Sequence, residues 1–541
     1  MSAILLATAV GFPLLLLLAS SGQSLRRRMP SLFAIAPVPA LAAAVFAPRG
    51  TMLTFGYGPC ALRFSLDVPG AILLGTAAAL WIFAGLYAAR ELRGREDGDG
   101  LILSWLITLT GCVGVFLAAD LVGFYFLLAV LSIGASGLVL QGKSSQALRA
   151  GALYFGIAFL AEAFVLAGLV LLAQATPHGS LLIRDAAQAL PNSPWRDLTL
   201  TLLLIGLGIK AGMVPMHFWM PLAYGTAPIP AAAVMSGAVV KASILAMIRF
   251  LPFGVALPDF GHPLAVIGLV GAFYGVAVGI TQSQPKIILA YSSVSQMGFI
   301  LALIGAGLAA GDKSVTLAAA FYAANHLLVK GALFLAVGAM MVTGRRHLWL
   351  VLVPAAVIAL GLGGLPPTGG ALAKYAAKNL LGGGFVGALA VASSIATTFL
   401  MVHFLRRLTA MTAADADARA PAVIAGSWLA MAIASLVLPW LLYLTIPIDT
   451  LQNAIAPSAL WSALWPVLVG VVLAFGLDRF TAQLPRIPAG DMGVVVYPIA
   501  EKSAAAGVLV ERLDTFARRW SVSSIALSLV SQLFAWALMG S

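Results

Sequence analysis

The sequence predicts an all-α, polytopic membrane protein, and both its composition and its periodicity support this. Of the 541 residues, 61% are hydrophobic and 9% are charged, whereas a soluble domain carries about 25% charged residues. The apolar residues gather into runs of about 20, the length at which a helix crosses the hydrocarbon core of a bilayer. The segments between these runs are too short for a soluble catalytic domain. Cys60 and Cys112 are the only cysteines, which excludes a disulfide scaffold.

The chain contains about sixteen candidate spans of this length. They lie near residues 3–21, 31–47, 68–90, 101–118, 120–140, 149–174, 198–225, 228–251, 263–282, 287–310, 314–342, 348–380, 384–408, 421–446, 459–478 and 523–540. The first run is followed, rather than preceded, by its arginine cluster, so we interpret it as a span and not as a signal peptide.

The basic residues predict how the chain is oriented. The loops after odd-numbered spans hold most of them, namely Arg26, Arg27, Arg28, Arg90, Arg93, Arg95, Lys143, Arg149, Lys286, Arg345, Arg346, Arg406, Arg407 and Arg419. The loops after even-numbered spans hold fewer, namely Arg49, Arg63, Arg184, Arg196 and Lys313. Because cytoplasmic loops are enriched in Lys and Arg, the N-terminus is expected on the outer face of the cell inner (cytoplasmic) membrane.

The segment 479–522 falls on the cytoplasmic side by this count. Its basic residues alternate with apolar ones, which predicts a short amphipathic helix lying along the membrane surface before a final span. An ordinary cytoplasmic linker with a helical stretch fits the same pattern.

Four lysines occur where lipid would otherwise be expected. Lys210, Lys241, Lys330 and Lys374 lie within apolar runs, and His326 precedes Lys330 by one helical turn on the same face. A charged group at the bilayer centre costs at least about 2.5–3.5 kcal/mol. Such lysines therefore either fix helix packing through ion pairs or line an ion path, and their number favours the path.

Proline and glycine interrupt two of the lysine-bearing spans. Pro215 and Pro221 break the seventh span, and the stretch from Pro366 to Gly370 breaks the twelfth. Broken helices free backbone groups that lipid cannot satisfy, so they are expected to line an enclosed or hydrated cavity. The two breaks are five spans apart. An odd spacing predicts a pair of repeats that are inverted in the membrane, as in many ion transporters.

Four stretches carry a resemblance to a known family. IKAGMVPMHFWMPLAYGTAPIPAAAVMSGAVVKASILAMIR, PKIILAYSSVSQMGF, NHLLVKGALF and GLPPTGGALAK resemble the antiporter-like membrane subunits of respiratory complex I (NADH:quinone oxidoreductase), membrane-bound hydrogenases and Mrp-type cation/proton antiporters. The likeness covers about spans four to thirteen. It implies about 14 core transmembrane helices with two inverted five-helix repeats, broken helices 7 and 12, and a buried Lys/His/water chain that moves protons.

Residue by residue, the resemblance implies which side chains carry protons. Lys210 and Lys241 match the family's lysines of spans seven and eight, and Lys374 matches that of span twelve. Lys286, His326 and Lys330 match its central connecting residues.

The resemblance also implies a division of the chain. We expect N-terminal spans (1–118), a first half-channel (119–251), a second half-channel (252–410), C-terminal spans (411–478), the lateral amphipathic segment (479–522) and a terminal anchor span (523–541).

The chain departs from the family pattern at two acidic positions. Ala129 stands where the family usually has the span-five glutamate, and Leu222 stands where it has an acid after the WLP-like motif. Glu162 in span six is the next carboxylate along the chain, and we hypothesise that it pairs with Lys210 instead. The alternatives are a packing or interface carboxylate at Glu162, a degenerate first half-channel, and a subunit that is chiefly structural.

The remaining polar residues suggest no chemistry of their own. His217 and Arg249 belong to the recognised motif and are expected near span ends as capping residues. No metal-ligand spacing, nucleophile motif or cofactor fingerprint stands out. Neither a metal nor a cofactor is predicted, nor a catalytic residue, and any enzyme activity would reside in other subunits.

Three functions remain open from the sequence. The first is a proton-translocating subunit of a redox-driven complex of the complex I or membrane-hydrogenase type, with other membrane subunits and soluble redox subunits as partners. The second is a D-like subunit of an Mrp-type cation/proton antiporter. The third is the membrane subunit of an inorganic-carbon uptake complex. The lysines do not distinguish H⁺ from Na⁺, and nothing in the composition indicates nucleic acid.

Overall fold

The computed structural model describes most of the chain. The described residues are 2–57, 61–93, 98–176, 179–382, 384–446, 449–477, 485 and 487–491. The chain divides into two compact units, Met1–Ala489 and Gly490–Ser541, and the helices and strands of the described residues all belong to the first. Most of the lateral segment expected at 479–522 and all of the final span expected at 523–540 lie outside the described residues.

The elements up to the break in the seventh span are mostly helical. They are α1 (Ser2–Ala19), α2 (Gln23–Arg26), α3 (Met29–Leu32), α4 (Val38–Phe46), β1 (Met52–Phe55), β2 (Leu62–Ser65), α5 (Val68–Leu92), α6 (Asp99–Leu117), α7 (Leu121–Leu140), α8 (Ser145–Gln174), α9 (Ile183–Ala189), the 3-10 helix η3 (Leu190–Asn192) and α10 (Arg196–Ala211).

The elements beyond that break complete the bundle. They are α11 (Trp219–Thr226), α12 (Ile229–Val234), the π-helix η4 (Met235–Val239), α13 (Lys241–Phe250), α14 (Pro258–Gly279), α15 (Pro285–Ala310), α16 (Val315–Met341), the 3-10 helix η5 (Arg345–His347), α17 (Trp349–Gly363), α18 (Gly369–Leu381), α19 (Gly384–Thr409), α20 (Ala422–Thr445), α21 (Leu451–Ala454) and α22 (Pro457–Gly476).

The helices confirm the predicted polytopic α-helical fold. Every expected span from 3–21 to 459–478 coincides with one helix or with two or three consecutive helical segments. Within the described part of the chain, 11 helices are long and apolar enough to cross a membrane. Spans seven and twelve are each split in two, as α10 with α11 and α17 with α18.

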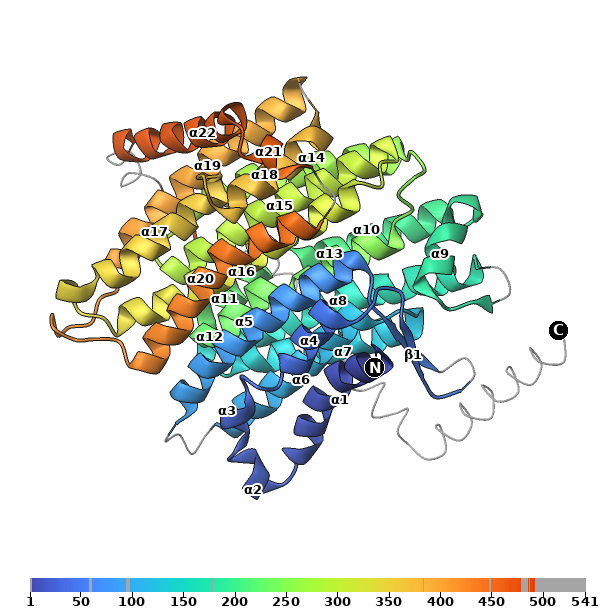
Figure 1. Ribbon diagram of the computed structural model, residues 1–541, viewed down its shortest axis with the longest axis horizontal. Coiled ribbons are helices and arrows are strands. Elements are labelled where there is room, and N and C mark those ends of the chain that lie inside the picture. The colour runs from blue at the N-terminus through green and yellow to red at the C-terminus, as the bar shows by residue number, and fades with distance from the viewer. Residues whose placement is uncertain are drawn as a thin grey trace, which may run out of the picture. The chain divides into compact units, whose positions relative to one another are not determined.

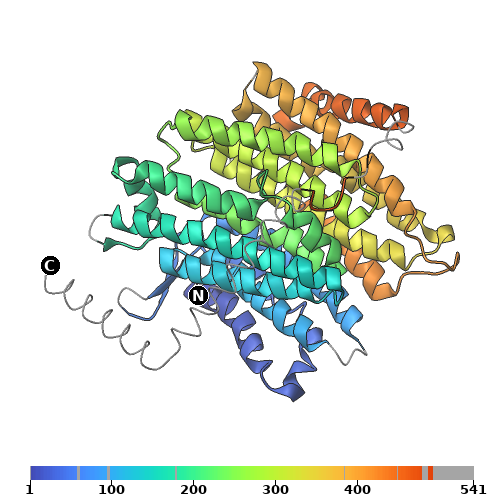
Figure 2. The same cartoon turned by 180° about the vertical axis from the view of Figure 1, so that it is seen from behind.

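The two halves of the bundle lie on either side of a central group of helices. Helices α5 to α8 (blue to cyan) are at one side and α17, α19 and α22 (yellow to orange-red) at the other, with the green helices between them (Figure 1). Helix α20 (orange) packs against α5 and α16 nearer the centre. The view from behind shows the same order (Figure 2). At the centre, an 18-residue stretch of α15 is entirely buried and the corresponding stretch of α16 almost entirely so. The polar side chains within these stretches therefore avoid lipid.

Closely packed glycines hold α14 against α15. A Cβ added at Gly268 would lie 2.5 Å from the backbone nitrogen of Ala302, and one at Gly275 would lie 2.6 Å from that of Ser295. Gly298 of α15 meets α14 equally closely. Small residues at a helix interface let two backbones approach each other in a membrane. The contact fixes the position of α15, which carries several of the buried polar residues.

A short β-hairpin departs from the all-α prediction. Strands β1 and β2 pair antiparallel, with Met52 opposite Ser65 and Phe55 opposite Leu62. The Asp120 carboxylate accepts hydrogen bonds from the backbone N–H of Arg63, at 2.7 Å, and from that of Gly123 in the first turn of α7. One buried carboxylate therefore caps a helix and fastens the hairpin to it.

Arg249 ties together the ends of three helices, as the sequence predicted for a capping residue. Its guanidinium forms a two-point ion pair with Asp67, the N-cap of α5, at 2.8 and 2.9 Å. It also donates to the carbonyls of Phe116 and Ala118 at the end of α6, at 2.8 and 3.0 Å. Burial raises the pKa of the Asp67 carboxyl, but the Arg249 guanidinium outweighs burial and holds that pKa below its ordinary value. The pair's stabilisation is therefore present at neutral pH and is lost as the pH falls through that lowered pKa.

Replacing Arg249 with methionine is expected to destabilise the protein by about 1–3 kcal/mol, because two carbonyls at the end of α6 lose their donor. The Asp67 side chain is 45% exposed, so water can replace part of its contact with Arg249. The measurement is the melting temperature of the purified protein in detergent. Arg346→Met is the matched control, since it breaks the Arg346–Asp417 pair, whose side chains are 71% and 61% exposed. Exposed pairs contribute about 0–1 kcal/mol. Equal shifts for both variants would contradict this role of Arg249.

Candidate ion-translocation site

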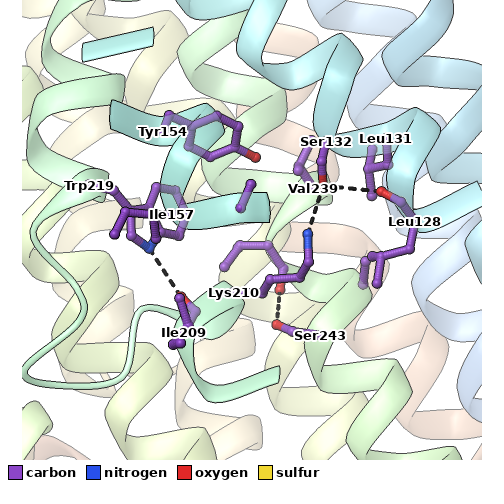
Figure 3. A pocket seen from close by; sticks show the side chains of 13 residues that line it. Leu128, Leu131, Ser132, Tyr154, Ile157, Ile209, Lys210, Trp219, Val239 and Ser243 are labelled. Carbon is purple, nitrogen blue, oxygen red and sulfur yellow. Dashed lines mark hydrogen bonds between the residues drawn. The ribbon is translucent and has the colours of Figure 1, made fainter. Parts of the chain in front are cut away.

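Lys210 lies where the seventh span breaks. Helix α10 ends at Ala211, and Gly212 follows in the left-handed conformation (φ 78°) that closes the helix. Lys210 is thus in the last turn of a half-helix that ends inside the protein. Its ammonium donates to Glu162 Oε1 at 2.8 Å and to Ser132 Oγ at 2.7 Å, and Figure 3 shows it pointing at Ser132. Helices α7, α8 and α10 therefore each contribute one polar group to this cluster.

The structure brings together the pair hypothesised from the missing span-five glutamate. Glu162 and Lys210 expose only 10% and 12% of their side chains. Ala129 lies three residues before Ser132 on α7, so it occupies the same face one turn away. A carboxylate from α8 thus reaches the lysine near the place where a span-five glutamate would stand.

A small cavity lies beside Lys210 and is also lined by Val240 and Ala242, the residues on either side of Lys241. Its volume is about 30 Å³, and its walls include Lys210, Ser132, Tyr154 and Ser243 (Figure 3). A water needs roughly 10–15 Å³ of such space and two or more polar partners. The cavity is therefore large and polar enough for one or two waters.

A π-helical segment precedes Lys241 and was not foreseen from the sequence. Segment η4 ends at Val239, and Lys241 begins α13. The Lys241 ammonium donates to the Ser236 carbonyl within this segment at 2.9 Å. It also lies 2.7 Å from Nδ1 of His326 on α16. Single π-turns inside α-helices recur at functional sites, and this one supplies a carbonyl ligand for a fully buried lysine.

Lys330 joins the same cluster through backbone and serine groups. Its ammonium donates to the Leu289 carbonyl at 2.9 Å, which also accepts from Ser293 Oγ at 3.1 Å. Ser293 Oγ in turn lies 2.9 Å from Ser236 Oγ. A pair of serine hydroxyls therefore links the surroundings of Lys241 and Lys330. His326 lies one turn before Lys330 on α16, and its Nε2 has no hydrogen-bond partner among the described residues. Neither serine stands out in the sequence.

Lys286 does not lie among these central groups, although the resemblance matched it to them. It is the second residue of α15 and donates to the carbonyl of Ala227, the C-cap of α11. Leu289, the acceptor for Lys330, follows it by one turn on the same helix. Lys286 therefore lies at one end of the row of buried lysines, at the face of the membrane that is predicted to be cytoplasmic.

Lys374 lies on the other side of its break. Gly364 (φ 110°) closes α17, and Lys374 is in the second turn of α18. Its ammonium donates to the Gly363 carbonyl at 3.0 Å and to Ser394 Oγ at 2.6 Å. It lines a cavity of about 400 Å³ between α18, α19 and α22. Lys210 precedes its break and Lys374 follows, so the two breaks correspond in backbone but not in the position of the lysine.

His217 corrects the expectation of a residue near a span end. It lies in the break between α10 and α11, is fully buried, and packs between the rings of Tyr274 and Tyr291 at 4.9 and 6.2 Å. Trp219 steadies the same break, because its indole N–H donates to the Ile209 carbonyl at 3.0 Å.

Comparison with known proteins agrees with this arrangement. The family described as "NADH:quinone oxidoreductase/Mrp antiporter, TM" matches residues 118–400. NADH-quinone oxidoreductase subunit N of Desulforudis audaxviator is 32% identical over 63% of this chain and 72% of its own length. Hydrogenase-4 component B of Escherichia coli is 30% identical over 53% of this chain, which spans only 44% of that protein.

A solved structure shows the same fold. The Mrp complex from Dietzia sp. DQ12-45-1b contains a chain that matches 99% of this one with a TM-score of 0.78 at 22% identity, and this chain covers 63% of it. The family match spans more than half of the sequence and includes Lys210, Lys241, His326, Lys330 and Lys374. The chain belongs to the transmembrane family of NADH:quinone oxidoreductase and Mrp antiporter subunits.

Proposed function

We propose that this chain moves protons across the membrane as the antiporter-like subunit of a multi-subunit complex. The observation that carries the proposal is the 2.7 Å contact between Lys241 and His326, both fully buried in the middle of the bundle. Charged groups are kept at this depth when they serve an ion path or a proton relay. A lysine and a histidine in direct contact can hold one shared proton and pass it to either side.

The proposed path has two parts. In the first half-channel (119–251), Glu162 replaces the missing partner of Lys210, and the cavity of about 30 Å³ connects that pair to Lys241. In the second half-channel (252–410), Lys286 is the cytoplasmic end, His326 and Lys330 form the centre, and Lys374 is the outer end. Each part contains one broken helix closed by a left-handed glycine, which supports the division into two repeats.

The orientation follows from the charged loops. We propose that the N-terminus faces outward in the cytoplasmic membrane. The loops that follow α16 and α19 support a common face for two of the arginine-rich segments, because the Gly344 N–H donates to the Ala418 carbonyl and Arg346 pairs with Asp417.

The partners proposed are other membrane subunits and a soluble redox module. The likeness to subunit N of NADH-quinone oxidoreductase and to hydrogenase-4 component B supports this assignment. An Mrp-type cation/proton antiporter subunit is the second candidate. A chain of an Mrp complex matches 99% of this chain in fold, which supports this second candidate.

Purification of the tagged chain from its host membrane distinguishes the redox-driven complex from the Mrp-type antiporter. Iron–sulfur and flavin subunits in the purified complex, with acidification of inverted vesicles after addition of a reductant, are the expected result. Small membrane subunits without cofactors, with proton release on a Na⁺ pulse, would assign the chain to an antiporter instead. No pH change under either condition would contradict proton movement.

A further inference from the structure

The line of polar groups has a gap between His326 and Lys374. On one side, Lys241 contacts His326 directly, and Lys330 is linked to Lys241 through the Leu289 carbonyl and the hydroxyls of Ser293 and Ser236. On the other side, Lys374 is joined to Ser394. Within the described residues, the two groups share no direct hydrogen bond. A connection is required if the second half-channel leads to Lys374.

Three buried side chains bridge this region. The Tyr322 hydroxyl on α16 donates to Gln296 Oε1 on α15 at 2.9 Å. The Gln296 amide then donates to Thr397 Oγ1 on α19 at 3.1 Å. Each of the three exposes 2% or less of its surface. The Tyr322–Gln296–Thr397 triad therefore crosses the bundle from the central helix to the helix that carries Ser394.

Both ends of the triad meet the line already described. Tyr322 precedes His326 by four residues on α16 and therefore lies on the same face one turn away. Thr397 follows Ser394 by three residues on α19. Ser394 is the hydroxyl that accepts from Lys374. The six residues therefore follow one another in the order His326, Tyr322, Gln296, Thr397, Ser394, Lys374. Hydrogen bonds join Tyr322, Gln296 and Thr397, and another joins Ser394 to Lys374. One helical turn separates each of the two remaining pairs.

Two neighbouring residues show that this region faces α18 and the Lys374 cavity. Phe299 stacks on Tyr322, with ring centroids 5.0 Å apart, and lines that cavity. Asn325, between Tyr322 and His326, is 3% exposed, and its Oδ1 has no hydrogen-bond partner among the described residues. A Cβ at Gly369, the first residue of α18, would lie 2.5 Å from that oxygen. A buried acceptor therefore points at the helix that carries Lys374.

Helix packing alone does not require the polar side chains of Tyr322, Gln296 and Thr397. A buried polar group costs free energy unless it is hydrogen-bonded, and apolar residues of similar size would fill the same space without that demand. Satisfied networks of this kind hold a unique arrangement of their members.

We propose that the triad is the connection between His326 and Lys374 in the second half-channel, an inference that rests on the proposed function. The Tyr322 and Thr397 hydroxyls carry the proton together with water. The Tyr322 hydroxyl accepts a proton on a lone pair from the His326 side and releases its own to a water beside Gln296. That water passes a proton to the Thr397 hydroxyl, which releases its own towards Ser394, so no charge remains on either hydroxyl. Gln296 is a positioning residue, because its amide holds both hydroxyls in line.

The test compares variants that remove one hydroxyl and keep the shape. In the purified complex, reconstituted in liposomes and driven as for the parent, Tyr322→Phe and Thr397→Val are each expected to slow proton transport about tenfold or more. Thr397→Ser restores the hydroxyl and is expected to keep most of the parental rate. Tyr443→Phe is the matched control, since Tyr443 is a buried tyrosine whose hydroxyl has no hydrogen-bond partner among the described residues.

The outcomes separate the inference from the function on which it rests. Parental rates in Tyr322→Phe and Thr397→Val would overturn the triad while leaving proton transport in place. Equal losses in Thr397→Val and Thr397→Ser would show a packing role and would overturn it as well. A parental complex that moves no protons under any driving force would instead overturn the proposed function. Rates are compared per assembled complex with an unchanged melting temperature.

Discussion

Replacing Glu162 with glutamine is expected to reduce proton transport by about tenfold or more, as for loss of a group that takes part in proton transfer. Glutamine keeps the size of the side chain and removes its charge. The Lys210 ammonium, which lies 2.8 Å from the carboxylate, would be left buried without a counter-charge. Removing one partner of a buried pair costs about 3–5 kcal/mol, so the lysine would lose its proton and would no longer be reloaded.

The measurement is the rate of acidification of vesicles that contain the assembled complex. Asp197→Asn is the matched control, because this carboxylate lies at the other end of α10, is 66% exposed and pairs with its neighbour Arg196. It is expected to leave the rate unchanged.

A second variant tests whether Glu162 does the work of the absent span-five glutamate. Adding Ala129→Glu to Glu162→Gln is expected to recover part of the lost rate, since Ala129 lies one turn from Ser132, which contacts Lys210. Full transport in Glu162→Gln alone would refute the pairing hypothesis.

Replacing Lys241 with methionine is expected to separate transport from stability. Lys241 is fully buried, and within the described residues its ammonium contacts the Ser236 carbonyl and His326 and no carboxylate. An apolar side chain of similar length removes the cost of burying an ammonium group, so the complex should assemble and melt at the same or a higher temperature. Transport should fall by about 100-fold or more, because the step between the two half-channels loses its proton carrier.

The control is Lys313→Met, which removes a lysine from the loop before α16. Its rate should equal that of the parent. Parental transport in Lys241→Met would mean that the central lysine carries no protons, and the proposed path would then fail at its middle.

The spans were predictable because the bilayer sets their length and excludes charge. The breaks at Pro215 and at the stretch from Pro366 to Gly370 were predictable too, since proline and glycine often interrupt helices. Pro221 was wrongly predicted to break the span, because it lies in the first turn of α11, where proline is tolerated. The lysines stood out for the same reason, as costly groups in apolar runs. The Glu162–Lys210 contact was predictable from two observations. Ala129 replaces the glutamate usual in span five, and Glu162 is the next carboxylate along the chain.

Other parts of the site left no signal in the sequence. Ser132, Ser236, Ser293 and Ser394 are ordinary residues of membrane helices, and only the fold shows which serine meets a lysine. The π-turn before Lys241 replaces an i→i−4 hydrogen-bond pattern locally, and propensity does not encode it. Lys286 is different, because the loop charges already placed it just before the span near 287–310, and α15 begins at Pro285.

Proton movement along this path depends on water joining buried ammonium groups that do not touch each other. A cryo-EM map of the assembled complex, at a resolution that shows ordered water, tests this most directly at the cavity of about 30 Å³ beside Lys210. We expect one or two waters there, bonded to Lys210 or Ser132 and leading to Lys241. A cavity closed by apolar side chains, with Lys210 and Lys241 separated by dry protein, would contradict the proposed path.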